Sequence, residues 1–137
     1  MYRHILIPLE NTPTDDAILS HIRSLARSTG ARLTLIHVAD GYMARNQEYF
    51  GESEEMRQDC AYLARREAEL KAEGFAVKSI LVCGNPANEV LAAADREQCD
   101  LIAMATHGHR FISDLIRGSV ASDVRHRARI PVLLIRA

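Results

Sequence analysis

Five short apolar segments alternate with amphipathic segments, and this alternation constrains the fold more than any other feature of the sequence. The apolar segments are His4–Leu9, Arg32–Val38, Ala76–Cys83, Asp100–Ala105 and Ile130–Ile135. They show little polar–apolar alternation, which is typical of strands covered by helices on both faces. Alternating strands and helices predict a parallel sheet with right-handed crossovers. We therefore expect an α/β fold with a doubly wound five-stranded parallel sheet, in the order 3-2-1-4-5.

The segments between these strands have helical periodicity and recognisable ends. Thr14–Ser28 is followed by Gly30, and Glu54–Glu73 is followed by Gly74, as expected where helices stop. A third helix begins at Asn85–Pro86, because Asn caps helices and Pro is tolerated in the first turn. The expected inner faces comprise Ile18, Ile22, Leu25, Ala26, Met56, Cys60, Leu63, Leu70, Ala87, Val90, Leu91 and Ala94.

The remaining segments are less regular. A last helical pattern is interrupted by Gly118, so we expect a short helix, a turn and a second helix that begins near Ser119. Asp40–Ser53 fits no element, and a loop of this length is often functional. The acidic residues on and just before the second helix are expected to form a solvated face, and they are Glu52, Glu54, Glu55, Asp59, Glu67, Glu69 and Glu73.

Length, charge and cysteine content exclude several classes of protein. The chain has 137 residues, so we expect residues 1–137 to form one domain. The formal net charge of −1 argues against a nucleic-acid partner, which requires a basic excess. We find no signal peptide and no apolar run of the roughly 20 residues that span a membrane, so we expect a cytoplasmic protein without membrane insertion. Cys60, Cys83 and Cys99 are expected to be reduced and buried.

Two loops are expected to meet at the ligand-binding edge of such a sheet. The order 3-2-1-4-5 places the switch point between strands one and four, and the loops that follow them are Leu9–Thr14 and Ala105–Arg110. Small residues in the second loop, including Gly108, let the backbone approach a ligand closely. A helix that begins near Gly118 and Ser119 would offer free N–H groups to a phosphate.

Several residues near these loops admit more than one role. His109 and Arg110 can donate to the same anion, whereas His107 and His109 form a His-x-His pair of a kind found in metal sites. No third ligand lies nearby in the sequence, so we expect no metal. Glu10 can act as a general base, but no nucleophile pairs with it, and a ribose or capping acceptor is the simpler role. His37 lies in an apolar strand and is expected to be a hydrogen-bonded core histidine.

The spacing of the small residues resembles the ATP-binding signature of the universal stress protein family. That signature is Gly-x2-Gly, nine residues and then Gly-Ser or Gly-Thr, and Ala105–Gly108, nine residues and Gly118–Ala121 follow it. Three apolar segments resemble the first, second and last strands of the family, namely Ile5–Pro8, Leu35–Val38 and Ile130–Arg136. The resemblance covers essentially the whole chain.

This resemblance implies a site for ATP or AMP, with or without Mg²⁺. The loop after strand one would contact the nucleotide, Val38 the adenine, and the glycines with Ser119 the ribose and phosphates. Ala105 takes the place of the first glycine, and Glu10 takes the place of a common Asp. The expected binding residues are Pro8, Leu9, Glu10, Val38, Ala105, His107, Gly108, His109, Arg110, Gly118, Ser119 and Val120, and no catalytic residue is assigned.

Three functions follow from these observations. The chain can be a nucleotide-binding regulatory module in stress response or signalling, a nucleotide-free dimeric interaction protein, or a slow ATPase or self-phosphorylating enzyme. We favour the first, since the sequence lacks a P-loop lysine motif and paired carboxylates for magnesium. An unidentified protein partner would bind according to whether nucleotide is bound. We also expect a homodimer through Ile130–Arg136, because an apolar strand at a sheet edge invites pairing and the resemblance points to the same strand.

Overall fold

The computed structural model has a five-stranded parallel sheet in the expected order. It describes residues 1–40, 54–106 and 114–137, with the backbone alone at 40 and 114–119. The sheet order is β3-β2-β1-β4-β5, and every neighbouring pair is parallel. The strands are β1 (His4–Pro8), β2 (Arg32–Asp40), β3 (Val77–Gly84), β4 (Leu101–Thr106) and β5 (Val132–Arg136).

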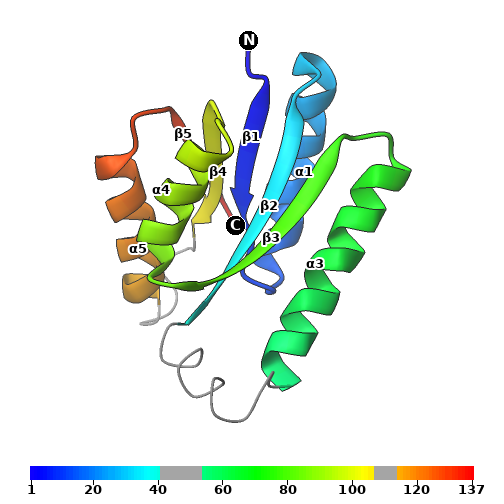
Figure 1. Cartoon of the computed structure of the whole chain (residues 1–137). Coiled ribbons are helices and arrows are strands. Elements are labelled where there is room, and N and C mark those ends of the chain that lie inside the picture. The colour runs from blue at the N-terminus through cyan, green and yellow to red at the C-terminus, as the bar shows by residue number, and fades with distance from the viewer. Residues whose placement is uncertain (41–53, 107–113) are drawn as a thin grey trace.

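The helices of the described residues form two layers, one on each face of the sheet. They are α1 (Thr14–Thr29), α3 (Glu54–Ala72), α4 (Pro86–Arg96) and α5 (Asp114–Arg127). Helices α1 and α3 cover one face, while α4 and α5 cover the other (Figure 1). The expected doubly wound α/β fold is confirmed. None of the described helices is long and apolar enough to cross a membrane.

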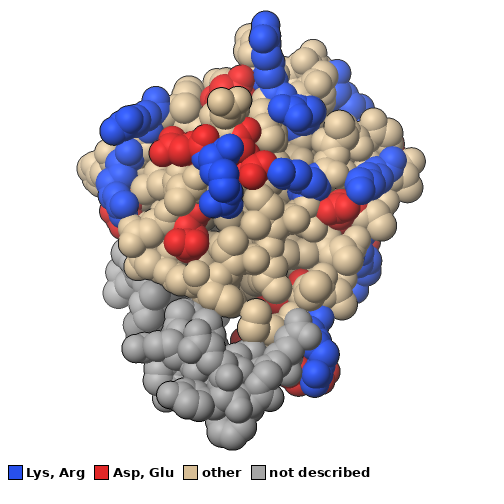
Figure 2. Space-filling model, in the orientation of Figure 1, with Lys and Arg blue, Asp and Glu red and all other residues tan. Residues whose placement is uncertain are grey.

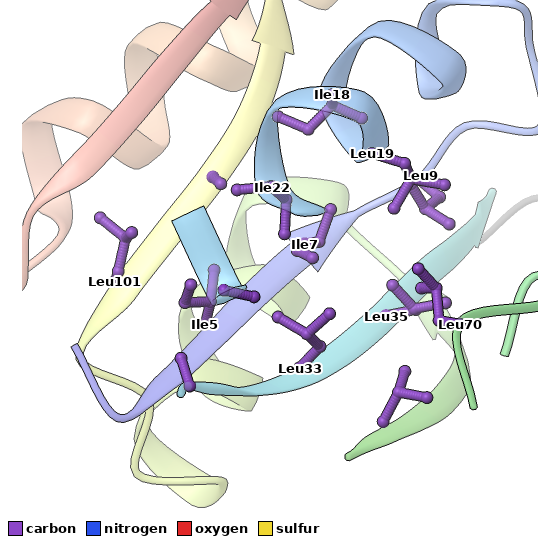
Figure 3. Packing of buried hydrophobic residues seen from close by; sticks show 14 of the residues in the cluster. Ile5, Ile7, Leu9, Ile18, Leu19, Ile22, Leu33, Leu35, Leu70 and Leu101 are labelled. Atoms are coloured by element: carbon purple, nitrogen blue, oxygen red, sulfur yellow. The ribbon is translucent and has the colours of Figure 1, made fainter. Parts of the chain in front are cut away.

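The central strands contribute to both halves of the core. Ile5 and Ile7 of β1 pack with α1 and α3, whereas Leu6 between them packs with α4 and α5. This follows from the two-residue period of a strand, which sends successive side chains to opposite faces. Figure 3 shows the first of these halves, where Ile18 and Ile22 of α1 lie over β1. Burial on both faces explains why these strands are continuously apolar.

Two of the expected helix boundaries are confirmed. Gly30 follows α1 with φ of 73°, a left-handed conformation that glycine adopts without strain, and its N–H donates to the carbonyl of Ala26. The side chain of Asn85 caps α4 by accepting from the N–H of Asn88 at 3.0 Å, and Pro86 follows it.

The expected inner face of α3 is partly wrong. Leu63 and Leu70 are buried as expected, but Cys60 is exposed, and Asp59 and Tyr62 are buried in its place. The helix is rotated because Asn11 of the loop after β1 and His37 of β2 bind Asp59, and Asp15 of α1 binds Tyr62. The assignment of Asp59 to a solvated face is therefore also wrong.

The expected break in the last helix is also wrong. Helix α5 runs without interruption from Asp114 to Arg127, so Gly118 and Ser119 lie in its second turn rather than at a helix start. The N–H groups of that turn bond within the helix. Glycine in a helix interior costs only about 1 kcal/mol relative to alanine, and burial of Ala121 and Val124 offsets this.

The expectation that all three cysteines are buried is wrong for two of them. Cys99 is buried, but Cys60 and Cys83 are exposed. Cys83 lies near the end of β3, which is an edge strand and is less covered than β1.

Candidate functional site

Five of the expected binding residues lie at the carboxyl ends of β1, β2 and β4 or in the loop that follows β1. Pro8 is the last residue of β1, and both Val38 and Ala105 lie within two residues of the ends of β2 and β4. β1 lies between the other two strands, so these ends meet at one edge of the sheet. Pro8, Val38 and Ala105 are all half-buried, which leaves part of each side chain accessible to a ligand. Glu10, in the loop after β1, is also half-buried.

The expected switch point is present between β1 and β4. The helix that follows β1 lies on one face of the sheet, and the helix that follows β4 lies on the other. Chains that leave adjacent strands in opposite directions create a crevice outside the strand ends. The described residues of the candidate site surround this position.

Leu9 contributes its backbone to this edge rather than its side chain. The side chain is only 3% exposed and belongs to the core beneath α1 and α3. Its N–H donates to the carbonyl of Ile36 at 2.8 Å, and its own carbonyl accepts from Nδ1 of His37 at 2.8 Å. These bonds fix the point where the chain leaves β1.

Asp15, in the first turn of α1, organises the loop after β1. Its carboxylate accepts from the N–H groups of Glu10 and Asn11 at 3.0 and 2.9 Å, and from the hydroxyl of Tyr62 at 2.5 Å. Asn11 adopts a positive φ of 61°, and Asp15 is only 1% exposed. A carboxylate that accepts from several donors holds those donors in place. The loop is thus tied both to α1 and to α3.

Tyr62 and Arg66 extend this network across α3. Burial, with the hydrogen bond to Asp15 as a second cause, raises the pKa of Tyr62 to about 12. Nε of Arg66 donates to the Tyr62 hydroxyl at 3.2 Å, and the guanidinium also pairs with Asp16 of α1. The phenol therefore stays neutral at ordinary pH and bridges a carboxylate and a guanidinium.

His37 of β2 is fully hydrogen-bonded, as the sequence predicts. Nδ1 faces the carbonyl of Leu9, and Nε2 lies 3.1 Å from Oδ2 of Asp59. The other oxygen of Asp59 accepts from the side-chain amide of Asn11 at 3.1 Å. A carbonyl oxygen only accepts, so Nδ1 is the donor in the bond to Leu9. This second bridge also joins the loop to α3.

Glu10 projects from the loop close to the start of α1. The hydroxyl of Thr14 donates to its carboxylate at 3.3 Å. This position places an acidic group in the loop that follows β1.

The rest of the expected binding set is only partly described. His107, Gly108, His109 and Arg110 lie outside the described residues, as does most of the loop from Asp40 to Ser53. Gly118 and Ser119 are placed by their backbone in α5, and Val120 is half-buried against the core beneath α4 and α5.

The sequence reasoning missed Asp15, Asn11, Asp59 and Tyr62 as residues that shape the site. For α3, the spacing of the polar residues in the sequence could have predicted this network. Asp59, Tyr62 and Arg66 are spaced by three and four residues, so they share one face of the helix with Leu63 and Leu70. Polar residues that share a face with buried leucines mark a buried polar network.

Comparisons with known proteins agree with this architecture. The sequence model of the universal stress protein family matches residues 1–136. Universal stress protein MJ0577 of Methanocaldococcus jannaschii is 27% identical over 155 residues, covering 99% of this chain and 96% of the relative. The solved structure of MJ0577 superposes with a TM-score of 0.78 and 29% identity, covering 100% of this chain and 97% of that one.

Two further structures have the same fold and contain ligands. A universal stress protein in complex with cAMP matches with a TM-score of 0.74 at 19% identity, covering 98% of this chain and 97% of that chain. A universal stress protein of Archaeoglobus fulgidus in complex with dAMP matches with a TM-score of 0.71 at 20% identity, covering 98% of both chains.

Proposed function

Because the chain belongs to the universal stress protein family, we propose that it is an adenine-nucleotide-binding regulatory module of stress response or signalling. The main support is the loop after β1, which Asp15 holds at the edge where β1, β2 and β4 end. The ligands of the two related complexes, cAMP and dAMP, both contain adenine and phosphate. ATP or AMP is the corresponding expectation for this chain.

The described residues suit the base and ribose half of such a ligand. Val38 and Pro8 offer half-buried apolar surface to adenine, and the Glu10 carboxylate can accept from ribose hydroxyls. Ala105 is small enough to let a ligand approach the end of β4. For the phosphates we propose His107, Gly108, His109, Arg110, Gly118, Ser119 and Val120.

We assign binding rather than rapid hydrolysis to this site. The Glu10 carboxylate is proposed to bind the ribose. Of the other carboxylates described at this edge, Asp15 is occupied by three donors, and Asp59 by His37 and Asn11. Neither is available to hold Mg²⁺ or to deprotonate an attacking water. Any phosphate release is expected to be slow, and a single-turnover assay with ATP measures it.

The test begins with the purified protein. Chromatography of the supernatant after denaturation identifies any adenine nucleotide that copurifies, and titration calorimetry measures binding of ATP and AMP. Replacing Gly118 by Val is expected to abolish binding, because the side chain fills the space proposed for phosphate. Arg125→Val, an exposed change on the same helix, controls for placing a β-branched side chain in this helix.

Unchanged affinity in Gly118→Val would place the phosphates elsewhere. If wild-type protein neither releases nor binds adenine nucleotides, the nucleotide-free interaction protein is the correct function.

We also propose that the protein is a homodimer joined through β5. This strand is at the edge of the sheet, and residues 132–135 are apolar and half-buried. Leu133 and Ile135 adjoin one half of the core, whereas Val132 and Leu134 adjoin the other. A second copy paired across a two-fold axis would cover both faces and close the assembly.

A further inference from the structure

A cavity lies at the end of the sheet opposite the proposed nucleotide site. It has a volume of about 320 Å³ and lies at the amino ends of β1, β2 and β3, next to the last residue of α4. In Figure 1 these strand ends are at the top, with the chain's N-terminus. Its size is at the lower end of the range for ligand pockets, which favours a small ligand.

The cavity is lined by an excess of positive charge. Arg32 begins β2, Lys78 lies on β3, Arg96 ends α4, and the one acidic residue of the lining is Glu97. Three cationic groups against one carboxylate leave a formal charge of +2 in a chain whose net charge is −1. Figure 2 shows that Lys, Arg, Asp and Glu side chains gather on this half of the drawn face.

The single carboxylate does not neutralise this cluster. Glu97 pairs with Lys78, and Nε of Arg96 lies 3.6 Å from its other oxygen. The hydrogen bond from Lys78 is the main cause that lowers the pKa of Glu97, so this group is charged at neutral pH. Arg32 has no carboxylate partner in the described part of the chain and is exposed at the rim.

His4 is a buried residue of the wall. The residue is 6% exposed, and its Nε2 lies 2.6 Å from the hydroxyl of Thr34, which also lines the cavity. Nδ1 has no hydrogen-bond partner in the described part of the chain. Burial, followed by the charge of Arg32, lowers the pKa of His4, so the ring is neutral. The neutral ring adds no charge to the cavity, so the charge of the wall comes from Arg32, Lys78, Arg96 and Glu97.

Part of the lining is apolar. Ala76 is exposed beside the basic residues, whereas Leu33 and Val77 also line the wall but are only 1% and 8% exposed. A bare inorganic ion makes no use of such surface, whereas an ester with a short organic group does.

We propose that this cavity binds a small phosphomonoester, with Arg32, Lys78 and Arg96 holding the phosphate. Arginine and lysine bind phosphate through charge-assisted hydrogen bonds, and Arg32 is the cation left without an acidic partner. The site is separate from the carboxyl edge of the sheet and does not depend on nucleotide binding there. The competing account is that these cations only offset the negative end of α4.

The experiment is a titration followed by amide NMR in low-salt, phosphate-free buffer. The probes are glycerol 3-phosphate and inorganic phosphate, with sodium chloride at matched ionic strength as the control. We expect saturable shifts confined to residues around Arg32, Lys78 and Arg96, and tighter binding of glycerol 3-phosphate than of inorganic phosphate. A shift of the His4 ring nitrogens would report that ring directly.

Arg32→Gln is the diagnostic variant, because it removes an exposed charge that has no ion pair. It should weaken glycerol 3-phosphate binding about tenfold, as expected for loss of a charge-assisted hydrogen bond. The matched control, Arg125→Gln, removes an exposed arginine on α5 and should change nothing. Gly118→Val should leave these shifts intact even where ATP binding is lost, which separates the two proposals.

Three results would overturn the proposal. The shifts could fail to saturate, sodium chloride could reproduce them, or the two glutamine variants could reduce them equally. Binding of inorganic phosphate without binding of glycerol 3-phosphate would also overturn it, since the ligand would then not be an ester.

Discussion

The hydroxyl of Tyr62 on α3 donates a 2.5 Å hydrogen bond to the carboxylate of Asp15 on α1. The two residues are 47 positions apart, and both are buried. The same carboxylate binds the backbone of the loop after β1. Through this one carboxylate, a helix on the outside of the sheet sets the shape of the loop at its functional edge.

Replacing Tyr62 by Phe is expected to lower the free energy of unfolding by about 1–3 kcal/mol, because Asp15 stays buried with one donor fewer. Urea denaturation followed by circular dichroism measures the change. Tyr2→Phe is the control, since the hydroxyl of Tyr2 makes no hydrogen bond to the described residues and its removal should have little effect. Equal stability of the two variants would show that the bond contributes nothing net.

Asp100 should stabilise the fold in a pH-dependent way. Burial opposes ionisation, but N–H groups of Arg3 and His4 donate to the carboxylate and lower its pKa below the usual value. A lowered pKa in the folded state means that the stabilisation is present above the unfolded pKa, about 3.9, and is lost as the pH falls through the folded value.

Asp100→Asn is therefore expected to destabilise the protein by about 1–2 kcal/mol at pH 7, and the difference should shrink in acid. Thermal melts across this range provide the measurement, with the exposed Asp95→Asn as control. A difference that stays constant as the pH falls to about 3 would contradict the assignment.

The three thiols should react unequally. Cys60 and Cys83 are exposed, whereas Cys99 is buried, and burial raises the pKa of its thiol to about 11. Alkylation near pH 8 followed by mass spectrometry should label the first two residues in the native protein and the third only after denaturation. Rapid labelling of native Cys99 would show that α4 and the strand after it open readily.

The proposed dimer can be tested at one outward-facing position of β5. The N–H of Ala137 donates to Thr106 of β4, and the carbonyl of Pro131 accepts from Ile102. Because these groups alternate along a strand, Leu133 points its N–H toward β4, and Leu134 points its N–H toward the open edge. Leu134→Pro should therefore weaken the dimer while keeping the sheet, whereas Leu133→Pro should also damage the fold.

Sedimentation equilibrium at micromolar concentration measures the assembly. Leu81→Pro provides the matched control, since by the same alternation its N–H faces outward on β3, the opposite edge. A monomeric wild-type protein with intact circular dichroism would exclude the dimer.

The carboxylate at position 10 should tolerate shortening. Glu10→Asp restores the acid common in the family and is expected to bind ATP at least as tightly as wild type, whereas Glu10→Gln should bind more weakly. Titration calorimetry compares the three proteins. A clear loss in the aspartate variant would mean that this site is built around the longer side chain, which Thr14 contacts in the structure.

The sheet could be predicted because its strands are mostly apolar and their order follows from crossover rules. The polar network could not be predicted in the same way. Asp59 was misplaced because an acidic residue on a charged helix is normally solvated, and its burial depends on partners distant in sequence, such as Asn11 and His37. The continuity of α5 was missed because the low helix propensity of Gly118 is visible in the sequence. The packing of Ala121 and Val124, which stabilises the helix, depends on the tertiary structure.

The loop after β1 needs no ligand to acquire its shape, because Asp15 binds two of its N–H groups and α3 reaches it through Asp59. A ligand that docks on this side therefore meets a surface whose conformational entropy was lost during folding. Substitutions at the α1–α3 contact should therefore lower ligand affinity, although these residues do not contact the ligand. The loop would be less ordered in the free protein, so binding would have to order it.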